Sequence, residues 1–192
     1  MKDKLVAFIR NTLPFAGTKA EEIATSFEEK HIDKNGFLLK EGKICNDYFF
    51  LEEGCMRAYT LDVDGREVTT GFYSSSQIVF EAASYFMRVP SKENIQALTD
   101  CKGFYMTFDQ LQVLFHSIPE FREFGRAVIV NCYVGLKQRM LSVINETAEE
   151  RYAHLISSRP EIFMHAPLKH IASYLGITDT SLSRIRKEFV HR

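Results

Sequence analysis

The segment from Leu168 to Phe189 carries polar side chains whose types and spacing suit hydrogen bonding to a nucleic acid. Arg184 is the most informative of them, because a guanidinium can donate two parallel hydrogen bonds to O6 and N7 of one guanine. Neighbouring hydroxyls and lysines could bind phosphate oxygens and so set the orientation on a duplex. The residues predicted to contact DNA are Lys169, Thr178, Asp179, Thr180, Ser181, Ser183, Arg184 and Lys187.

Apolar residues in the same segment predict two short helices that cross. They recur at the spacing of one helix face on both sides of Gly176, a residue type that often ends a helix in the left-handed conformation. Thr178 follows as the candidate N-cap of the second helix. This pattern predicts a helix-turn-helix whose second helix lies in the major groove, with an ordinary pair of packed helices as the alternative. The inward-facing residues are Leu168, Ile171, Ala172, Leu175, Leu182 and Ile185.

Basic charge is concentrated near this segment. Residues 168–192 hold five Lys and Arg against two Asp and Glu. The whole chain of 192 residues has 24 Lys and Arg against 25 Asp and Glu, and its formal net charge is −1. This balance excludes a protein coated in positive charge for non-specific binding of nucleic acid. A phosphate backbone would instead meet the basic end of the chain.

Residues 31–108 have the texture of short antiparallel strands. Turn-forming residues recur about every ten positions, and aromatic or β-branched runs lie between them. Asp64-Gly65 is the clearest hairpin turn, because a type I′ turn needs positive φ at both central positions. The spacing predicts a sandwich or barrel, and a rolled sheet of this kind can hold a small ligand.

A long helix is predicted from Pro119 to about Glu146, since proline is favoured in the first helical turn. Its length, roughly 40 Å at 1.5 Å per residue, exceeds what one small sheet can cover. The helix is therefore predicted to form a dimer seam, where Gly125 and Gly135 let two helices approach, and a core helix on the sheet is the alternative. The apolar stripe of this seam consists of Phe121, Phe124, Val128, Cys132, Leu136, Met140 and Val143.

Three stretches of the chain carry a resemblance to the catabolite-activator/FNR (Crp/Fnr) family of bacterial transcription regulators, and the resemblance covers nearly the whole chain. The first is the glycine rhythm at positions 36, 42, 54 and 65, together with the run from Glu41 to Tyr59 that contains YFFLEEGCMRAY. The second is the long helix. The third is IASYLGIT followed by LSRIRK, between Ile171 and Lys187.

The resemblance implies an α+β fold in three parts. Residues 1–117 would form an N-terminal antiparallel β-roll, a cyclic nucleotide-binding-like jelly roll for an effector. Residues 118–146 would form the dimerisation helix, and residues 147–192 a C-terminal helix-turn-helix domain of winged-helix type. A homodimer is implied that binds a two-fold site in double-stranded DNA, with ligand state altering how the two reading heads are presented. RNA polymerase is an expected further partner, and the cytoplasm is the expected location.

Carried over to this sequence, Arg184 occupies the position of the family's base-reading arginine. Asp179 and Thr180 stand where the family often has an arginine and a glutamate, so the family's usual half-site sequence is not expected here. Asp179 would repel phosphate, or accept a hydrogen bond from N4 of cytosine.

The effector position departs from the family's cyclic-nucleotide pattern. The family holds the ligand's phosphate with an arginine in an Arg-Ser/Thr-Ala segment, which Ser91-Lys92-Glu93 replaces here. Glu81 stands at the family's glutamate, and Lys92 or Arg88 would replace the missing arginine only in part. An unidentified small effector, or none, is therefore favoured over cyclic AMP. The predicted pocket residues are Glu81, Arg88, Ser91 and Lys92.

No enzyme is predicted, because the chain lacks G-x-S-x-G, a phosphate loop and H-E-x-x-H. The four cysteines form no C-x-x-C pair and lack the N-terminal cluster of iron–sulfur sensors, so no metal, catalytic residue or cofactor is assigned. Redox switching through Cys101 or Cys132 stays an alternative. No signal peptide is expected, and no apolar run approaches the roughly 18–20 residues of a membrane span.

A second class of function also stays open, which is a ligand-binding or protein-interaction module that has lost specific DNA binding. The printed sequence ends a few residues after the second helix of the helix-turn-helix. The wing that family members commonly carry there is therefore expected to be short or missing.

Overall fold

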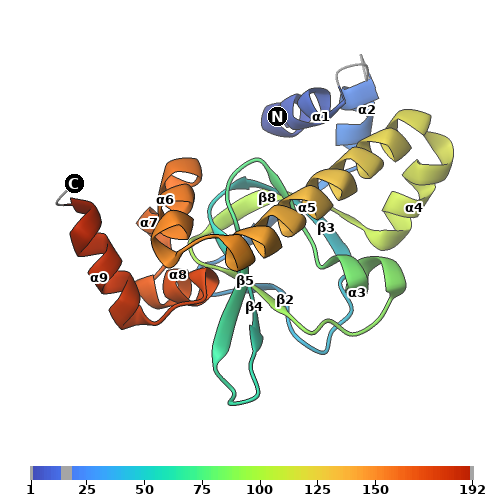
Figure 1. Ribbon diagram of the computed structural model, residues 1–192. Coiled ribbons are helices and arrows are strands. Elements are labelled where there is room, and N and C mark those ends of the chain that lie inside the picture. The colour runs from blue at the N-terminus through green and yellow to red at the C-terminus, as the bar shows by residue number, and fades with distance from the viewer. Residues whose placement is uncertain (1, 14–18, 191–192) are drawn as a thin grey trace.

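The computed structural model describes residues 2–13 and 19–190. Its centre is a roll of two four-stranded antiparallel sheets, one with the order β1-β8-β3-β6 and the other with the order β2-β7-β4-β5 (Figure 1). The strands are β1 (Glu28–Ile32), β2 (Phe37–Leu39), β3 (Asp47–Glu53), β4 (Met56–Leu61), β5 (Glu67–Tyr73), β6 (Gln77–Val79), β7 (Asn94–Ala97) and β8 (Cys101–Thr107). The predicted antiparallel roll is confirmed.

Helices stand before, within and after the roll. Thr107 and Thr147 begin α4 and α6 with capping boxes, and Pro119 stands in the first turn of α5. The short helices α3 and α7 have no counterpart among the predicted elements, because six residues are too few to show a helical period. The helices are α1 (Asp3–Thr12), α2 (Lys19–Thr25), α3 (Ala82–Met87), α4 (Phe108–Ser117), α5 (Pro119–Asn145), α6 (Ala148–Ser158), α7 (Pro160–His165), α8 (Leu168–Leu175) and α9 (Asp179–Val190).

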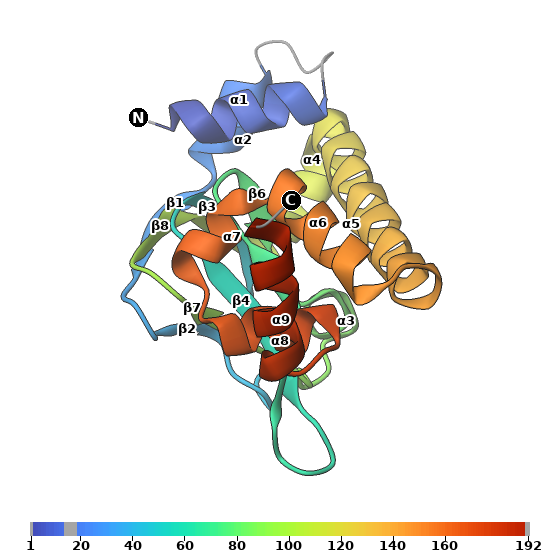
Figure 2. The same cartoon turned by 60° about the vertical axis from the view of Figure 1, so that its left-hand side comes forward.

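The long helix α5 runs along one side of the roll (Figures 1 and 2). Helices α1 and α4 contact it toward its N-terminal end. Helices α6 to α9 follow its C-terminal end and gather at the opposite side of the molecule. The order of a roll, a long helix and a C-terminal helical unit confirms the predicted α+β class.

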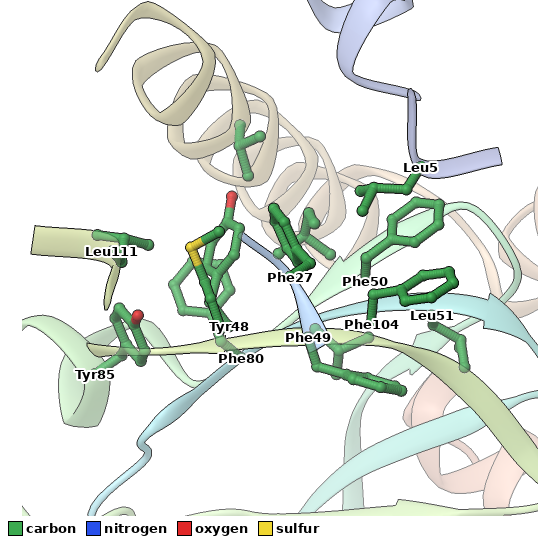
Figure 3. Close-up of a cluster of buried hydrophobic side chains, with 14 of the residues drawn as sticks. Leu5, Phe27, Tyr48, Phe49, Phe50, Leu51, Phe80, Tyr85, Phe104 and Leu111 are labelled. Carbon is green, nitrogen blue, oxygen red and sulfur yellow. The ribbon is translucent and has the colours of Figure 1, made fainter. Parts of the chain in front are cut away.

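The larger hydrophobic core fills the interior of the roll between its two sheets and extends to helices α1, α2, α4 and α5. Figure 3 shows its rings crowded together, among them Phe27, Phe50 and Phe104. Phe50 and Phe124 are completely buried, and both rings pack against Phe8 of α1. Because a fully buried aromatic or aliphatic side chain stabilises the fold by roughly 1.5–3 kcal/mol, this core firmly attaches the N-terminal half of α5 to the roll.

A second core joins the roll to the C-terminal helices. Cys55, Phe72 and Leu98 of the roll belong to it. The C-terminal helices therefore bury part of their apolar surface on the roll and do not form a separate body. Their buried members are Tyr152, Leu155, Ile162, Ala166, Ile171, Ala172, Leu175, Leu182 and Ile185.

The apolar stripe of α5 divides in two, so the prediction that the whole stripe forms a dimer seam is wrong for its first part. Phe121, Phe124 and Val128 are buried in the larger core of their own chain, because the roll, α1 and α4 cover this half of the helix. Gly125 also serves packing within the chain, since a Cβ there would lie 2.5 Å from Cζ of Phe115. The exposed members of the stripe are Cys132, Leu136, Met140 and Val143.

Gly103 of β8 lies where β3 passes closely, since a Cβ there would stand 2.1 Å from the carbonyl oxygen of Phe50. We expect Gly103→Ala to lower the free energy of unfolding by about 1–3 kcal/mol, because backbone cannot yield as a flexible side chain can. Urea unfolding measures the change. Gly71→Ala in β5 is the control, because the nearest neighbour of a Cβ there is the Tyr73 ring at 3.8 Å. Equal losses in the two variants would contradict this explanation.

Candidate functional site

The turn between α8 and α9 gives α9 two different faces. Gly176 ends α8 with a φ of 70°, and its N–H donates back to carbonyls of α8. Thr178 Oγ1 accepts the N–H of Ser181 at 3.2 Å at the start of α9. Leu182 and Ile185 are 0% and 1% exposed, so one face of α9 is fixed in the second core. The opposite face is left to solvent.

The exposed face of α9 carries the polar groups that the sequence singled out. The Arg184 side chain is 71% exposed, and its Nε lies 4.0 Å from a carboxylate oxygen of Glu188. Such a guanidinium is free to take other partners, since an exposed i,i+4 pair is weak. Ser181 is half-buried. The exposed members of the predicted set are Lys169, Thr178, Asp179, Thr180, Ser183, Arg184 and Lys187.

Helix α8 docks on β5 of the roll, beneath α9 (Figure 2). The N–H of Thr69 donates to Oγ of Ser173 at 2.9 Å. A guanidinium nitrogen of Arg57 lies 2.6 Å from Nδ1 of His170. These contacts join strand residues to the exposed end of the chain, and they fix α8 relative to the roll. Since α9 packs on α8, they fix α9 as well.

Arg57 and His170 form a buried polar cluster at this junction. Arg57 is 2% exposed, contacts the Glu67 carboxylate and stacks on the Tyr59 ring with 4.1 Å to the ring centroid. Burial, followed by the positive charge of Arg57, lowers the pKa of His170 to about 4. The imidazole is therefore neutral at pH 7, and its Nδ1 can accept the Arg57 N–H.

Three further arginines bind backbone carbonyl groups around the same junction. Two of these carbonyls end α8, where the helix dipole favours positive charge. The third belongs to the end of β5. The contacts are Arg139 to Tyr174 at 3.0 Å, Arg151 to Leu175 at 2.9 Å and Arg159 to Phe72 at 2.6 Å. They connect α5, α6 and the residue before α7 to α8 and the roll.

A cavity of about 630 Å³ lies between the roll, α3 and α5. Glu81 and Glu93 line it, together with Tyr73 and Arg139. Among the four predicted pocket residues, Glu81 lines this cavity. Its carboxylate accepts two backbone N–H groups at the start of α3, at 3.0 and 2.6 Å, and so caps that helix.

The structure does not bring Arg88, Ser91 and Lys92 to this cavity, which corrects the prediction that they line the effector pocket. Arg88 donates to the carbonyl of Cys45 at 2.9 Å and stacks on Phe108. Ser91 is 3% exposed and hydrogen-bonds within its own turn, while Lys92 is exposed. The physical reason is that these hydrogen bonds hold Arg88 at the segment before β3 and Ser91 in the turn before β7.

Three of the four cysteines are buried and Cys132 is exposed. Within residues 2–13 and 19–190, no group of three or more His, Cys, Asp or Glu side chains could hold a metal ion. Burial raises the pKa of Cys45 to about 11 and that of Cys55 to about 12, and it also raises the pKa of Cys101. Because the thiolate is the reactive form, the raised pKa disfavours redox switching at Cys101, whereas switching at the exposed Cys132 stays a prediction.

By length and composition alone, α5 could cross a membrane, although the sequence predicts no membrane span. Phe121 and Phe124 pack in the larger core, and Arg139 donates to carbonyl groups of α8 and β5. Both ends of α5 therefore pack against or hydrogen-bond to other parts of the same chain. Contact with lipid is not the explanation that this packing favours for its exposed apolar residues.

The chain is similar to known proteins in sequence. Residues 29–117 match the family described as cyclic nucleotide-binding domain. The fumarate and nitrate reduction regulatory protein of Yersinia pestis is 24% identical over 173 residues, which cover 84% of this chain and 68% of that protein. Electron transport regulator A of Shewanella oneidensis is 25% identical over 174 residues, with coverage of 84% and 68%.

The chain also shares its fold with solved structures. FixK2 from Bradyrhizobium japonicum matches with a TM-score of 0.72 at 18% identity, covering 86% of this chain and 85% of that one. A CooA mutant from Carboxydothermus hydrogenoformans matches with a TM-score of 0.69 at 19% identity, covering 92% and 84%. A crp/fnr family regulator from Eubacterium rectale matches with a TM-score of 0.71 at 16% identity, covering 93% and 87%.

The buried neutral imidazole of His170 predicts a pH-dependent stability. An unfolded histidine binds its proton near pH 6.5, whereas the folded chain does so near pH 4, so stability falls as the pH drops between these values. We expect this group to cost about 3 kcal/mol of unfolding free energy over that range. Urea unfolding at several pH values measures it, with His170→Gln as the control that keeps an acceptor for Arg57. The account fails if both proteins lose the same stability between pH 6.5 and 4.

Proposed function

We propose that the chain is a DNA-binding transcription regulator of the Crp/Fnr family that acts as a homodimer. Its residues 29–117 match the cyclic nucleotide-binding domain family, and its sequence and fold are similar to those of Crp/Fnr regulators. The observation that carries the proposal is the two-sided character of α9. One face is fixed in the core through Leu182 and Ile185, and the other presents Arg184 to solvent. A rigidly held helix with an exposed polar side suits the major groove.

The polar groups of this surface divide into base-reading and phosphate-binding roles. Arg184 would donate to O6 and N7 of a guanine. Lys169, Lys187 and the hydroxyls near the start of α9 would bind phosphates, which positions the helix without reading sequence. Asp179, exposed in the first turn of α9, would accept from N4 of cytosine. The half-site is thus expected to contain a guanine opposite Arg184.

The exposed part of α5 supports the homodimer. Large apolar side chains are exposed around this part of the helix, and extended apolar surface of this kind is typical of interaction sites. A second α5 packed alongside would cover them, with Cys132, Leu136, Met140 and Val143 at the seam. The exposed residues are Ile129, Val130, Tyr133, Val134, Leu136, Met140, Leu141, Val143 and Ile144.

The cavity beside α3 would bind an unidentified small effector or no effector at all, and it would not bind cyclic AMP. Two carboxylates, Glu81 and Glu93, line it and would repel a cyclic phosphate. Arg139 lines it too, but already donates to carbonyl groups of β5 and α8. Because α5 forms one wall, a bound effector would act on the proposed seam.

Three further expectations stay predictions. They are the division into residues 1–117, 118–146 and 147–192, the contact with RNA polymerase, and the cytoplasmic location.

DNA reading is tested by Arg184→Ala. Selection of bound sequences from random duplexes first supplies the site. We then expect the variant to lose roughly 5- to 100-fold in affinity for this site for each half-site guanine, since a bidentate contact discriminates by about 1–3 kcal/mol, while its affinity for random duplex changes little. Fluorescence anisotropy at several salt concentrations measures both affinities.

Arg66→Ala is the matched control for that experiment, because Arg66 is 76% exposed at the β4–β5 hairpin and carries the same charge. Unchanged selectivity in Arg184→Ala would contradict the reading role. Absence of any salt-dependent DNA binding by the unaltered chain would instead favour a ligand-binding or protein-interaction module that has lost DNA binding.

The dimer seam is tested by Leu136→Glu. Leu136 is 67% exposed on α5, so a glutamate there leaves the fold intact but places two like charges in the seam. We expect sedimentation velocity to show a dimer for the unaltered chain and a monomer for the variant. Val113→Glu is the control, since Val113 is 66% exposed on α4, away from the seam. A dimer that survives Leu136→Glu would refute this seam.

A further inference from the structure

A second cavity, of about 490 Å³, lies where the C-terminal end of α5 meets α6 and α8. It is lined differently from the cavity beside α3, although Arg139 borders both. Arg151, His154 and Arg159 also line it. Its volume falls within the range of small-molecule sites, roughly 300–1,000 Å³.

The lining of this cavity carries an excess of positive charge. Glu146 lines it as well, but its carboxylate already accepts from the Ser142 hydroxyl and lies 3.2 Å from Nδ1 of His154. Among the residues that the structure describes, Arg139, Arg151 and Arg159 form no ion pair with a carboxylate. Three guanidinium charges thus surround one cavity without a matching set of anions.

The carbonyl partners of these arginines neither neutralise the guanidinium charges nor accept all of their N–H groups. A carbonyl oxygen carries a partial charge only, and each guanidinium has five N–H groups. Nε of Arg159 is buried and has no hydrogen-bond partner among the described residues. Burial lowers the pKa of Arg139, and the charge of Arg159 acts in the same direction, against Tyr174 and Glu93, which raise it. An anion in the cavity would offset the repulsion between Arg139 and Arg159.

We propose that this cavity binds a small anion with a phosphate group, held by Arg139 and Arg159, with Arg151 and His154 at its border. Guanidinium groups bind phosphate oxygens through paired, charge-assisted hydrogen bonds, which are stronger than hydrogen bonds to neutral carbonyls. Arg139 belongs to α5, and Arg159 stands between α6 and α7. A phosphate between them would therefore connect the long helix directly to the C-terminal helices.

An effect of the bound anion on DNA reading rests on the proposed function, whereas the binding of the anion to the cavity does not. If α9 reads DNA, an anion that holds α6 and α8 against the end of α5 fixes the reading head in the position seen here. Both effects can be separated, because binding of the anion is measurable without DNA.

The binding is tested by isothermal titration of the full chain with pyrophosphate at constant ionic strength. We expect millimolar or tighter binding with one anion per chain, and Arg159→Gln weakens it by roughly tenfold or more. Arg66→Gln, at the exposed β4–β5 hairpin, is the matched control and leaves the affinity unchanged. Titration with succinate separates a phosphate site from a general dianion site. No binding of pyrophosphate, equal binding of succinate, or a loss caused by Arg66→Gln and not by Arg159→Gln, overturns the proposal.

A second measurement on the unaltered chain guards against a variant that fails to fold. Hydrogen exchange, followed by peptide with and without pyrophosphate, is expected to slow in residues 138–159 and around Tyr174. Slowing confined to residues 179–189 would assign the anion to the outer face of α9 and would refute the cavity site.

Discussion

The docking of α8 on β5 is the constraint on which the arrangement of this molecule depends. The Phe72 and Tyr174 rings pack there with centroids 5.2 Å apart, and the buried Arg57 reaches His170 across the same junction. Burial of the Arg57 charge without partners would cost several kcal/mol, so its contacts with His170, Glu67, Gln96 and the Tyr59 ring are a condition for keeping it there. Helix α9 depends on this junction, because it is held through its packing on α8.

The junction also explains how events elsewhere could reach the exposed face of α9. Arg139 of α5 donates to the carbonyl of Tyr174, so α5 and α8 share a direct contact. The same arginine borders the cavity beside α3 and the cavity at the end of α5. A ligand in either cavity, or a second chain along α5, therefore acts on groups that are one contact away from α8.

Local patterns predicted the elements well, and long-range contacts poorly. Gly176, Leu182 and Ile185 identify the helix-turn-helix from sequence, because their spacing alone decides which face is buried. The stripe of α5 could not reveal that Phe121 and Phe124 pack within their own chain, since an apolar face shows that burial occurs but not against what. The predicted pocket failed for a similar reason. The carbonyl of Cys45, 43 residues away in the chain, holds Arg88, and Ser91 bonds within its own turn, and neither contact leaves a periodic signal.

The sequence does not reveal the junction itself. Arg57 and His170 are 113 residues apart in the chain, and although each lies inside a segment that resembles the family, neither segment indicates that the two side chains meet. The role of a single buried histidine or arginine depends on its hydrogen-bond partner, which only the folded structure identifies. The same holds for Arg139 and Arg159, whose shared cavity exists only because α5, α6 and α8 converge.

The central claim is that two docked α8–α9 units are held at fixed positions by a pair of α5 helices. Hydroxyl-radical footprinting of the full chain on its selected DNA site tests this claim most directly. The account predicts two protected segments on one face of the duplex, related by two-fold symmetry and centred about 10 base pairs, or one helical turn, apart. A single protected segment, or two whose separation varies from site to site, would contradict it.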